Sequence, residues 1–184
     1  PDDNPVADFE SFFSIFHTYL ELRKGQKLHF ELGRSIVGVI GNLISKKMNI
    51  NFIDTDRTIE KVAKMKISNI FLKMGEKYFR DLEEKITIKS LSLTNTVISL
   101  GGGAFMNENI RSEIIKNNLS FWLNIDAPTL LKRIKKSKKR PVVLNLNDNQ
   151  IIKLIESRAK TYSKAKFKIN CHKLTKNEIV KKII

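Results

Sequence analysis

The sequence predicts an α/β protein in which helices cover both faces of a parallel sheet. Short apolar segments rich in β-branched residues alternate with longer segments of helical periodicity along most of the 184 residues. This alternation is typical of parallel strands joined by helical crossovers. Polar or glycine-rich clusters follow two of the apolar segments, and ligand sites in such sheets lie at the carboxyl ends of the strands. The length suits one domain with a sizeable core.

Each expected strand is a short apolar run bounded by turn-forming or polar residues. The predicted strands cover residues 35–40, 51–53, 96–100, 120–124 and 167–169. The segments between them show helical periodicity, and Pro128 fits the first turn of one such helix. The predicted helices cover residues 41–48, 58–63, 67–74, 76–91, 108–117, 128–137, 150–164 and 176–184. Residues 138–149 are polar and are expected to be irregular.

Residues 1–34 differ in composition from the rest of the chain. They are rich in Phe and Asp and poor in Ile, and Phe12, Phe13, Phe16, Tyr19 and Leu20 have helical spacing. We therefore expect an atypical N-terminal segment with a short helix, packed on a domain that covers residues 35–184.

Composition narrows the classes of partner. The net charge is +15, but only eight of the 34 basic residues are Arg, and Lys, Ile and Asn are abundant. That bias is typical of an AT-rich genome, and no nucleic-acid-binding motif accompanies the charge. No apolar run is long enough to span a bilayer, and Cys171 is the single cysteine. We expect a cytoplasmic protein that binds neither nucleic acid nor membrane.

Two clusters stand where strands are expected to end. Asp54-Thr55-Asp56 follows one strand, and Gly101-Gly102-Gly103 follows another. The aspartates could cap a helix, or they could serve a metal ion and a substrate hydroxyl. The glycines could form a plain turn, or they could let a ligand approach the backbone closely.

Several groups of residues, in this order and spacing, resemble the shikimate kinase family. The groups are Phe52-Ile53-Asp54-Thr55-Asp56, Ile59-Glu60, Gly75-Glu76-Lys77-Tyr78-Phe79-Arg80, Ser99-Leu100-Gly101-Gly102-Gly103-Ala104, Arg133, Arg140-Pro141 and Glu156-Ser157-Arg158 with Tyr162 and Ala165. The resemblance implies a three-layer P-loop kinase-like fold with a five-stranded parallel sheet flanked by helices. It implies transfer of the γ-phosphoryl group of ATP, with Mg²⁺, to the 3-hydroxyl of shikimate in aromatic amino-acid biosynthesis, by a monomer.

The resemblance also implies roles for the substrate residues. Asp56 would accept a hydrogen bond from the attacking hydroxyl and act as its base. Arg80 and Arg158 would bind the shikimate carboxylate as planar forks. Gly102 and Gly103 would offer backbone N–H groups to the substrate.

Other residues would serve the nucleotide. Asp54 would help to hold Mg²⁺, and Arg133 would lie along the nucleotide. Arg140 would reach over the phosphates from a mobile lid at residues 138–149, where it would stabilise charge and exclude water.

One expected motif is absent from the sequence. A P-loop kinase carries G-x-x-x-x-G-K-[ST] between its first strand and first helix, but Ile36, Val37, Gly38 and Val39 occupy the corresponding final positions. The loop could be lost, replaced by foreign sequence over the first forty residues, or omitted between Val37 and Ile40. The chain is therefore expected to phosphorylate shikimate poorly. The alternatives are a dead shikimate-binding pseudokinase and another small-molecule kinase of the same fold.

Overall fold

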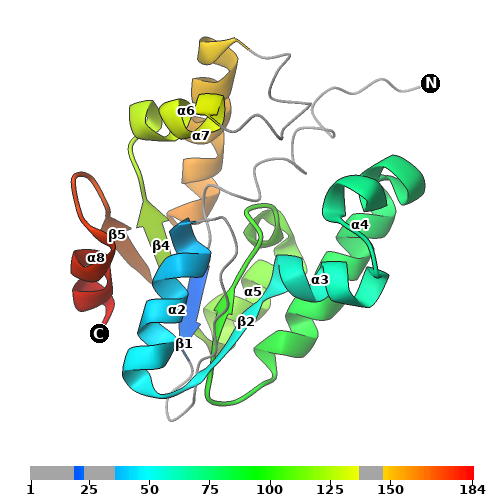
Figure 1. Cartoon of the computed structure of the whole chain (residues 1–184), viewed down its shortest axis with the longest axis horizontal. Helices are drawn as coiled ribbons and strands as arrows, with labels where there is room; N and C mark the ends of the chain where they lie inside the picture. The colour runs from blue at the N-terminus through cyan, green and yellow to red at the C-terminus, as the bar shows by residue number, and fades with distance from the viewer. Residues whose placement is uncertain (1–18, 23–35, 137–146) are drawn as a thin grey trace.

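A computed structural model of the chain describes residues 19–22, 36–136 and 147–184. Figure 1 shows the described helices arranged around a central sheet. Most of residues 1–34 and most of the segment expected to form a lid lie outside the described residues. Of the expected lid, the structure describes residues 147–149. Asn147 caps α7 (Asp148–Tyr162) there and is not itself helical, but residues 148 and 149 belong to the helix, so the irregular conformation expected for these two residues is wrong.

The sheet contains both parallel and antiparallel pairs. Its strands are β1 (Tyr19–Leu22), β2 (Asn51–Asp54), β3 (Thr96–Ser99), β4 (Leu119–Asn124) and β5 (Phe167–Asn170), in the spatial order β2-β3-β1-β4-β5. β2 is parallel to β3 and β4 is parallel to β5, as expected. β1 runs antiparallel to both β3 and β4. The prediction of an all-parallel sheet is therefore wrong at its central strand.

The strand predicted over residues 35–40 is instead the start of a helix, α2 (Ile36–Met48). Val37, Ile40 and Ile44 are fully buried at helical spacing. A short apolar run does not by itself distinguish a buried strand from a buried helix, and here the run continues into the helical pattern after residue 40. Ile36 and Val37 therefore do not begin the first strand.

The central strand comes from the segment that was expected to be helical. The backbone of Tyr19 pairs with Trp122, and that of Leu20 pairs with Phe121 and Ser99. β1 lies between β3 and β4, and the backbone N–H and C=O groups of both strands need hydrogen-bond partners there. An extended segment supplies those partners, and a helix does not. This tertiary requirement outweighs the helical spacing of Tyr19 and Leu20.

The other helices lie close to the expected positions. They are α3 (Thr55–Ala63), α4 (Ile67–Leu91), α5 (Glu108–Asn117), α6 (Ala127–Lys136), α7 (Asp148–Tyr162) and α8 (Lys176–Ile183), with a 3₁₀ turn η2 (Ala104–Met106). α4 is interrupted at Gly75, whose φ of 80° and ψ of 168° are non-helical. This break confirms the prediction of separate helical segments over residues 67–74 and 76–91.

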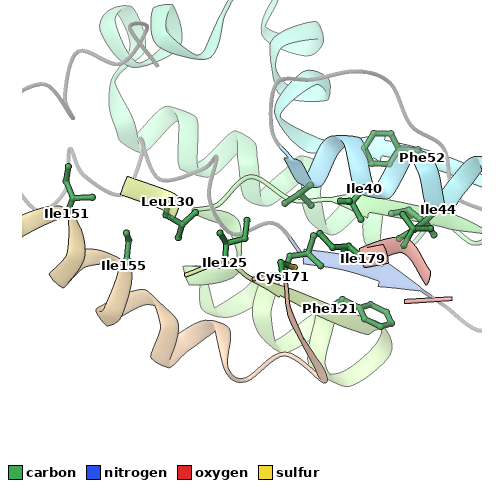
Figure 2. Packing of buried hydrophobic residues seen from close by; sticks show 14 residues of the cluster. Ile40, Ile44, Phe52, Phe121, Ile125, Leu130, Ile151, Ile155, Cys171 and Ile179 are labelled. Atoms are coloured by element: carbon green, nitrogen blue, oxygen red, sulfur yellow. The ribbon is translucent and has the colours of Figure 1, made fainter. Parts of the chain in front are cut away.

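Two apolar clusters on opposite faces of the sheet make three layers. Val97 packs into a cluster with α2 and α8, while its neighbour Ile98 packs into a cluster with α5 and Tyr162 of α7. Alternate residues of a strand point to opposite faces, so both faces of β3 are covered. Figure 2 shows the first cluster, in which Ile40 and Ile44 of α2 lie near Ile179 of α8.

Within the described ranges, no helix combines the length and the apolar character needed to cross a membrane. This agrees with the absence of a long apolar run in the sequence.

Candidate active site

The aspartate cluster forms the junction between β2 and α3. Asp54 is the N-cap of α3, and its Oδ1 accepts a hydrogen bond of 3.1 Å from the backbone N–H of Arg57. Asp56 lies in the first turn of α3, where its negative charge interacts favourably with the positive end of the helix dipole. Of the two aspartates, Asp54 therefore caps the helix. The half-buried side chain of Asp56 instead lies against Gly101, which follows β3.

Thr55 joins the aspartate cluster to the glycine turn, which we define as residues 101–103. The Thr55 side chain is fully buried. Its hydroxyl donates to the carbonyl oxygen of Ser99 at 3.2 Å and accepts from the backbone N–H of Gly101 at 3.1 Å. Because β2 and β3 pair in parallel with Asp54 opposite Ser99, their carboxyl ends meet at this point.

Two positions of the glycine turn have no room for a side chain. A Cβ at Gly101 would collide with Oδ1 of Asp56 and would come within 3.0 Å of Oε1 of Glu83. A Cβ at Gly103 would collide with Nη1 of Arg80. The glycines therefore allow charged side chains to approach the backbone, rather than serving only as a turn.

The expected substrate arginines converge on one buried acid. Arg80 on α4 donates from Nη1 to Oε2 of Glu83 at 2.7 Å, and from Nε to Oε1 of Glu76 at 3.1 Å. Arg158 on α7 is only 2% exposed and interacts electrostatically with Glu83. Glu83 thus links the helix that carries one arginine to the helix that carries the other.

Tyr162 fixes the middle of the glycine turn. Its hydroxyl donates to the carbonyl oxygen of Gly102 at 2.6 Å and hydrogen-bonds Arg158. Its ring is fully buried, with its centroid 6.5 Å from that of Phe105 and 6.2 Å from that of Trp122. Tyr162 follows Arg158 by one helical turn on α7, so the same helix supplies both groups.

Burial and neighbouring charges act in opposite directions on the ionisable groups of this site. Burial raises the pKa of Glu83, although Arg80 and Arg158 counteract part of the shift. Burial also raises the pKa of Asp54. For Arg80, burial lowers the pKa, but Glu83 and Glu76 outweigh it and hold the pKa above its ordinary value. Arg80 is therefore charged at every physiological pH.

The structure brings together most of the residues expected for the substrate. Asp56, Arg80, Arg158 and the glycine turn surround the carboxyl ends of β2 and β3. Sequence reasoning missed the supporting roles of Glu83, Thr55 and Tyr162. The three-residue spacing of Arg80 and Glu83 on a helix was an available signal, because residues three apart are neighbours on a helix surface.

The residues expected for the nucleotide are less fully described. Arg133 lies in α6, and Arg140 falls outside the described residues. The first turn of α2 is formed by Ile36, Val37 and Gly38, and it offers neither a lysine nor a hydroxyl. The described residues therefore do not include the side chains that hold a triphosphate in a P-loop.

For Mg²⁺, the described residues provide one suitable carboxylate. Oδ1 of Asp54 accepts the capping hydrogen bond from Arg57, and Oδ2 takes no part in that bond. The described residues contain no group of three or more side chains that could hold a metal ion. This suits Mg²⁺, which in phosphotransferases is bound by one or two carboxylates together with phosphate oxygens and water.

A family model described as "Shikimate kinase" matches residues 38–184. The chain belongs to the shikimate kinase family. It is therefore a phosphotransferase of the shikimate kinase type, from a family that uses ATP with Mg²⁺ in aromatic amino-acid biosynthesis. The match to the shikimate kinase family begins at residue 38, within the four positions, 36–39, where the phosphate loop would end.

Relatives and solved structures agree with this assignment. The shikimate kinase of Bartonella henselae is 36% identical over 147 residues, which are 79% of this chain and 70% of the relative. The crystal structure of shikimate kinase from Aquifex aeolicus is 36% identical, with a TM-score of 0.71 over 86% of this chain and 92% of that chain. These likenesses favour shikimate kinase over another small-molecule kinase of similar fold.

A third solved structure bears on the fold alone. It is shikimate kinase from Acinetobacter baumannii in complex with shikimate, 23% identical, with a TM-score of 0.71 over 87% of this chain and 92% of that chain. Together, the solved shikimate kinases indicate a P-loop kinase-like α/β fold for the described residues.

Proposed function

We propose that the chain binds shikimate at the carboxyl ends of β2 and β3 and holds its 3-hydroxyl against Asp56. The observation that carries this proposal is the convergence of two arginines and a backbone turn. Arg80 reaches the glycine turn from α4, and Arg158 on α7 bonds Tyr162, whose hydroxyl holds that turn. Nη2 of Arg80 is buried and has no hydrogen-bond partner among the described residues, so a substrate carboxylate would satisfy it.

The site residues would divide the substrate between them. Arg80 and Arg158 would hold the carboxylate, and the N–H groups of Gly102 and Gly103 would donate to hydroxyl oxygens of the substrate. Asp56 would accept the proton of the attacking 3-hydroxyl, from a position set by the first turn of α3. Phosphoryl transfer depends mainly on such positioning and on neutralising phosphate charge.

The nucleotide half of the proposal rests on other residues. Arg133 would lie along ATP, Arg140 would reach its phosphates from the lid at residues 138–149, and Asp54 would help to hold Mg²⁺. Residues 35–184 would form the kinase domain, joined to the atypical segment 1–34, and would act as a cytoplasmic monomer. Without a phosphate loop, ATP binding and turnover should be weak, because an N–H cradle at a helix N-terminus is missing.

Separate titrations of shikimate and of ATP by calorimetry test this proposal. The unmodified chain should bind shikimate measurably and ATP more weakly. Arg80→Ala should abolish most of the shikimate affinity, because the substrate carboxylate would lose a cation and the buried Glu83 would lose its ion pair of 2.7 Å.

Lys77→Ala provides a matched control for that titration. Lys77 is 89% exposed and lies on the same helix as Arg80, so its removal should leave shikimate binding unchanged. No measurable affinity for shikimate in the unmodified, folded chain would refute the proposed function.

A further inference from the structure

We infer that the hydroxyl groups of Thr55 and Tyr162 are positioning groups that hold the glycine turn from its two sides and so set its amides for the substrate. This inference rests on the proposed function, since it deepens the account of the same site. Neither residue would touch shikimate. Each would act through the backbone of the turn, Thr55 at Gly101 and Tyr162 at Gly102.

Thr55 fixes where the turn begins. Its hydroxyl lies between the carbonyl of Ser99, the last residue of β3, and the N–H of Gly101. The Thr55 hydroxyl therefore supplies hydrogen-bond partners to two backbone groups at the point where β3 ends. Because Thr55 is fully buried, the loss of its hydroxyl would leave a buried N–H and a buried carbonyl without that partner.

Tyr162 fixes the next peptide of the turn. The bond of 2.6 Å from its hydroxyl to the Gly102 carbonyl orients the peptide group between Gly102 and Gly103, and hence the N–H of Gly103. The Tyr162 ring cannot move readily, because Phe105 and Trp122 pack against it. Burial raises the pKa of Tyr162 to about 12, so its hydroxyl stays protonated and remains a donor.

The turn has little freedom to adjust without these two bonds. Gly101 lies against Asp56 and Gly103 lies against Arg80, so closely that neither position admits a Cβ. A small shift of the turn would therefore displace the acid or the arginine. Thr55 also adjoins Asp56 in the chain, and Tyr162 bonds Arg158. The two hydroxyls thus keep the acid, the arginine and the backbone amides in one arrangement.

Three variants test the inference in the full chain, with shikimate titrated by calorimetry at a temperature where circular dichroism shows each variant folded. Thr55→Val and Tyr162→Phe should each raise the dissociation constant for shikimate about tenfold, which corresponds to about 1.4 kcal/mol. Thr55→Ser, which keeps the hydroxyl, should bind within about threefold of the unmodified chain, or about 0.65 kcal/mol.

Thr87→Val is the matched control for a buried threonine. Thr87 is fully buried on α4, and its Oγ1 has no hydrogen-bond partner among the described residues. The change Thr87→Val should therefore leave shikimate affinity unchanged. Equal affinity for shikimate in Thr55→Val and the unmodified chain would overturn the inference, and so would an equal loss in Thr55→Val and Thr55→Ser.

Amide hydrogen exchange in the ligand-free protein separates this inference from the proposed function. The Gly101 N–H should exchange at least about tenfold faster in Thr55→Val than in the unmodified chain, the ratio that follows from losing about 1.4 kcal/mol of protection. Thr55→Ser should restore slow exchange. If shikimate does not bind at all, the proposed function fails, and unchanged Gly101 exchange in Thr55→Val would then overturn the positioning role as well.

Discussion

Gly103 lies so close to the guanidinium of Arg80 that a methyl group at Cα would collide with Nη1. Arg80 cannot retreat easily, because Glu76 and Glu83 hold it on two sides. Gly103→Ala should therefore displace Arg80 and raise the dissociation constant for shikimate about tenfold or more, within the range of 1–3 kcal/mol typical of overpacking. Calorimetric titration checks this expectation.

The control for Gly103→Ala is Ser112→Ala on the exposed surface of α5. It removes an exposed polar group outside the glycine turn and should not alter shikimate affinity. If Gly103→Ala bound shikimate as well as the unmodified chain does, Arg80 would not contact the substrate from the position described.

Tyr162 gives the protein a specific sensitivity to alkali. Burial raises its pKa from the ordinary value of 10.0 to about 12. A group with a raised pKa in the folded state contributes stability below its unfolded pKa and loses it as pH rises through the folded pKa. The free energy of unfolding should therefore fall between about pH 10 and about pH 12, and Tyr162→Phe should show a shallower fall.

Urea denaturation at several alkaline pH values measures this slope, with Tyr78→Phe as the control. Tyr78 is 42% exposed on α4, so Tyr78→Phe removes an exposed hydroxyl where Tyr162→Phe removes a buried one. Identical slopes for Tyr162→Phe and the unmodified chain would show that the Tyr162 hydroxyl is not held in its neutral form by burial.

At the scale of elements, the break in α4 depends on Gly75. Its φ of 80° and ψ of 168° lie in a region that is essentially restricted to glycine. Gly75→Ala should lower the free energy of unfolding by about 1–3 kcal/mol, although no atom within 4 Å would meet the new methyl group. The loss would come from backbone strain alone.

Urea denaturation at neutral pH tests this prediction, and Lys73→Ala on the exposed face of the same helix serves as the control. Lys73→Ala should change stability by less than about 0.5 kcal/mol, as is usual for surface positions. A Gly75→Ala protein as stable as the unmodified one would mean that α4 can run straight through residue 75.

The elements that the sequence predicted well are those with strong local signals. α5 has the bounds expected from its periodicity, and Gly75 divides α4 where glycine was expected to break the pattern. Prediction failed at α2 and β1, where local pattern and tertiary position disagree. Residues 36–40 are apolar enough for a strand but continue into a helix. Tyr19–Leu22 has no strong strand pattern, and pairing with β3 and β4 determines its conformation.

The residues that the family motifs name for the substrate come together around the glycine turn. Asp56, Arg80 and Arg158 were identified from the family resemblance, and their proximity to the glycine turn agrees with that expectation. Thr55, Glu83 and Tyr162 were not identified, because their roles depend on partners far away in the sequence. Tyr162 lies 60 residues from Gly102, and Thr55 lies 46 residues from Gly101.

At the scale of the whole molecule, the substrate half and the phosphate half of the site are separable. The residues expected for shikimate are present, while the sequence lacks the phosphate loop before α2. Restoring a glycine-rich loop whose final Gly-Lys-Ser-Thr takes the positions of residues 36–39, at the start of α2 and immediately before Ile40, should produce ATP-dependent phosphorylation of shikimate. The inserted N–H groups and lysine would supply electrostatic stabilisation of several kcal/mol, the order of magnitude of such contacts.

A coupled assay of ADP release measures this gain, and Asp56→Asn in the loop-bearing protein is its control. Asp56→Asn should remove most of the restored turnover, because the 3-hydroxyl would lose its base. Brisk phosphorylation of shikimate by the unmodified chain would contradict the prediction and would show that other residues hold the triphosphate.

Trp122 gives the molecule an optical probe beneath the proposed shikimate site. It is the single tryptophan of the chain, it is 3% exposed in β4, and it packs against Tyr162, whose hydroxyl holds Gly102. Nζ of Lys168 lies 4.7 Å from the centroid of the Trp122 ring and makes a cation–π contact with the indole. A movement of the glycine turn should therefore shift Tyr162 and, through it, change the surroundings of the Trp122 indole. The intrinsic fluorescence of Trp122 should then report shikimate binding at the proposed site without an added label.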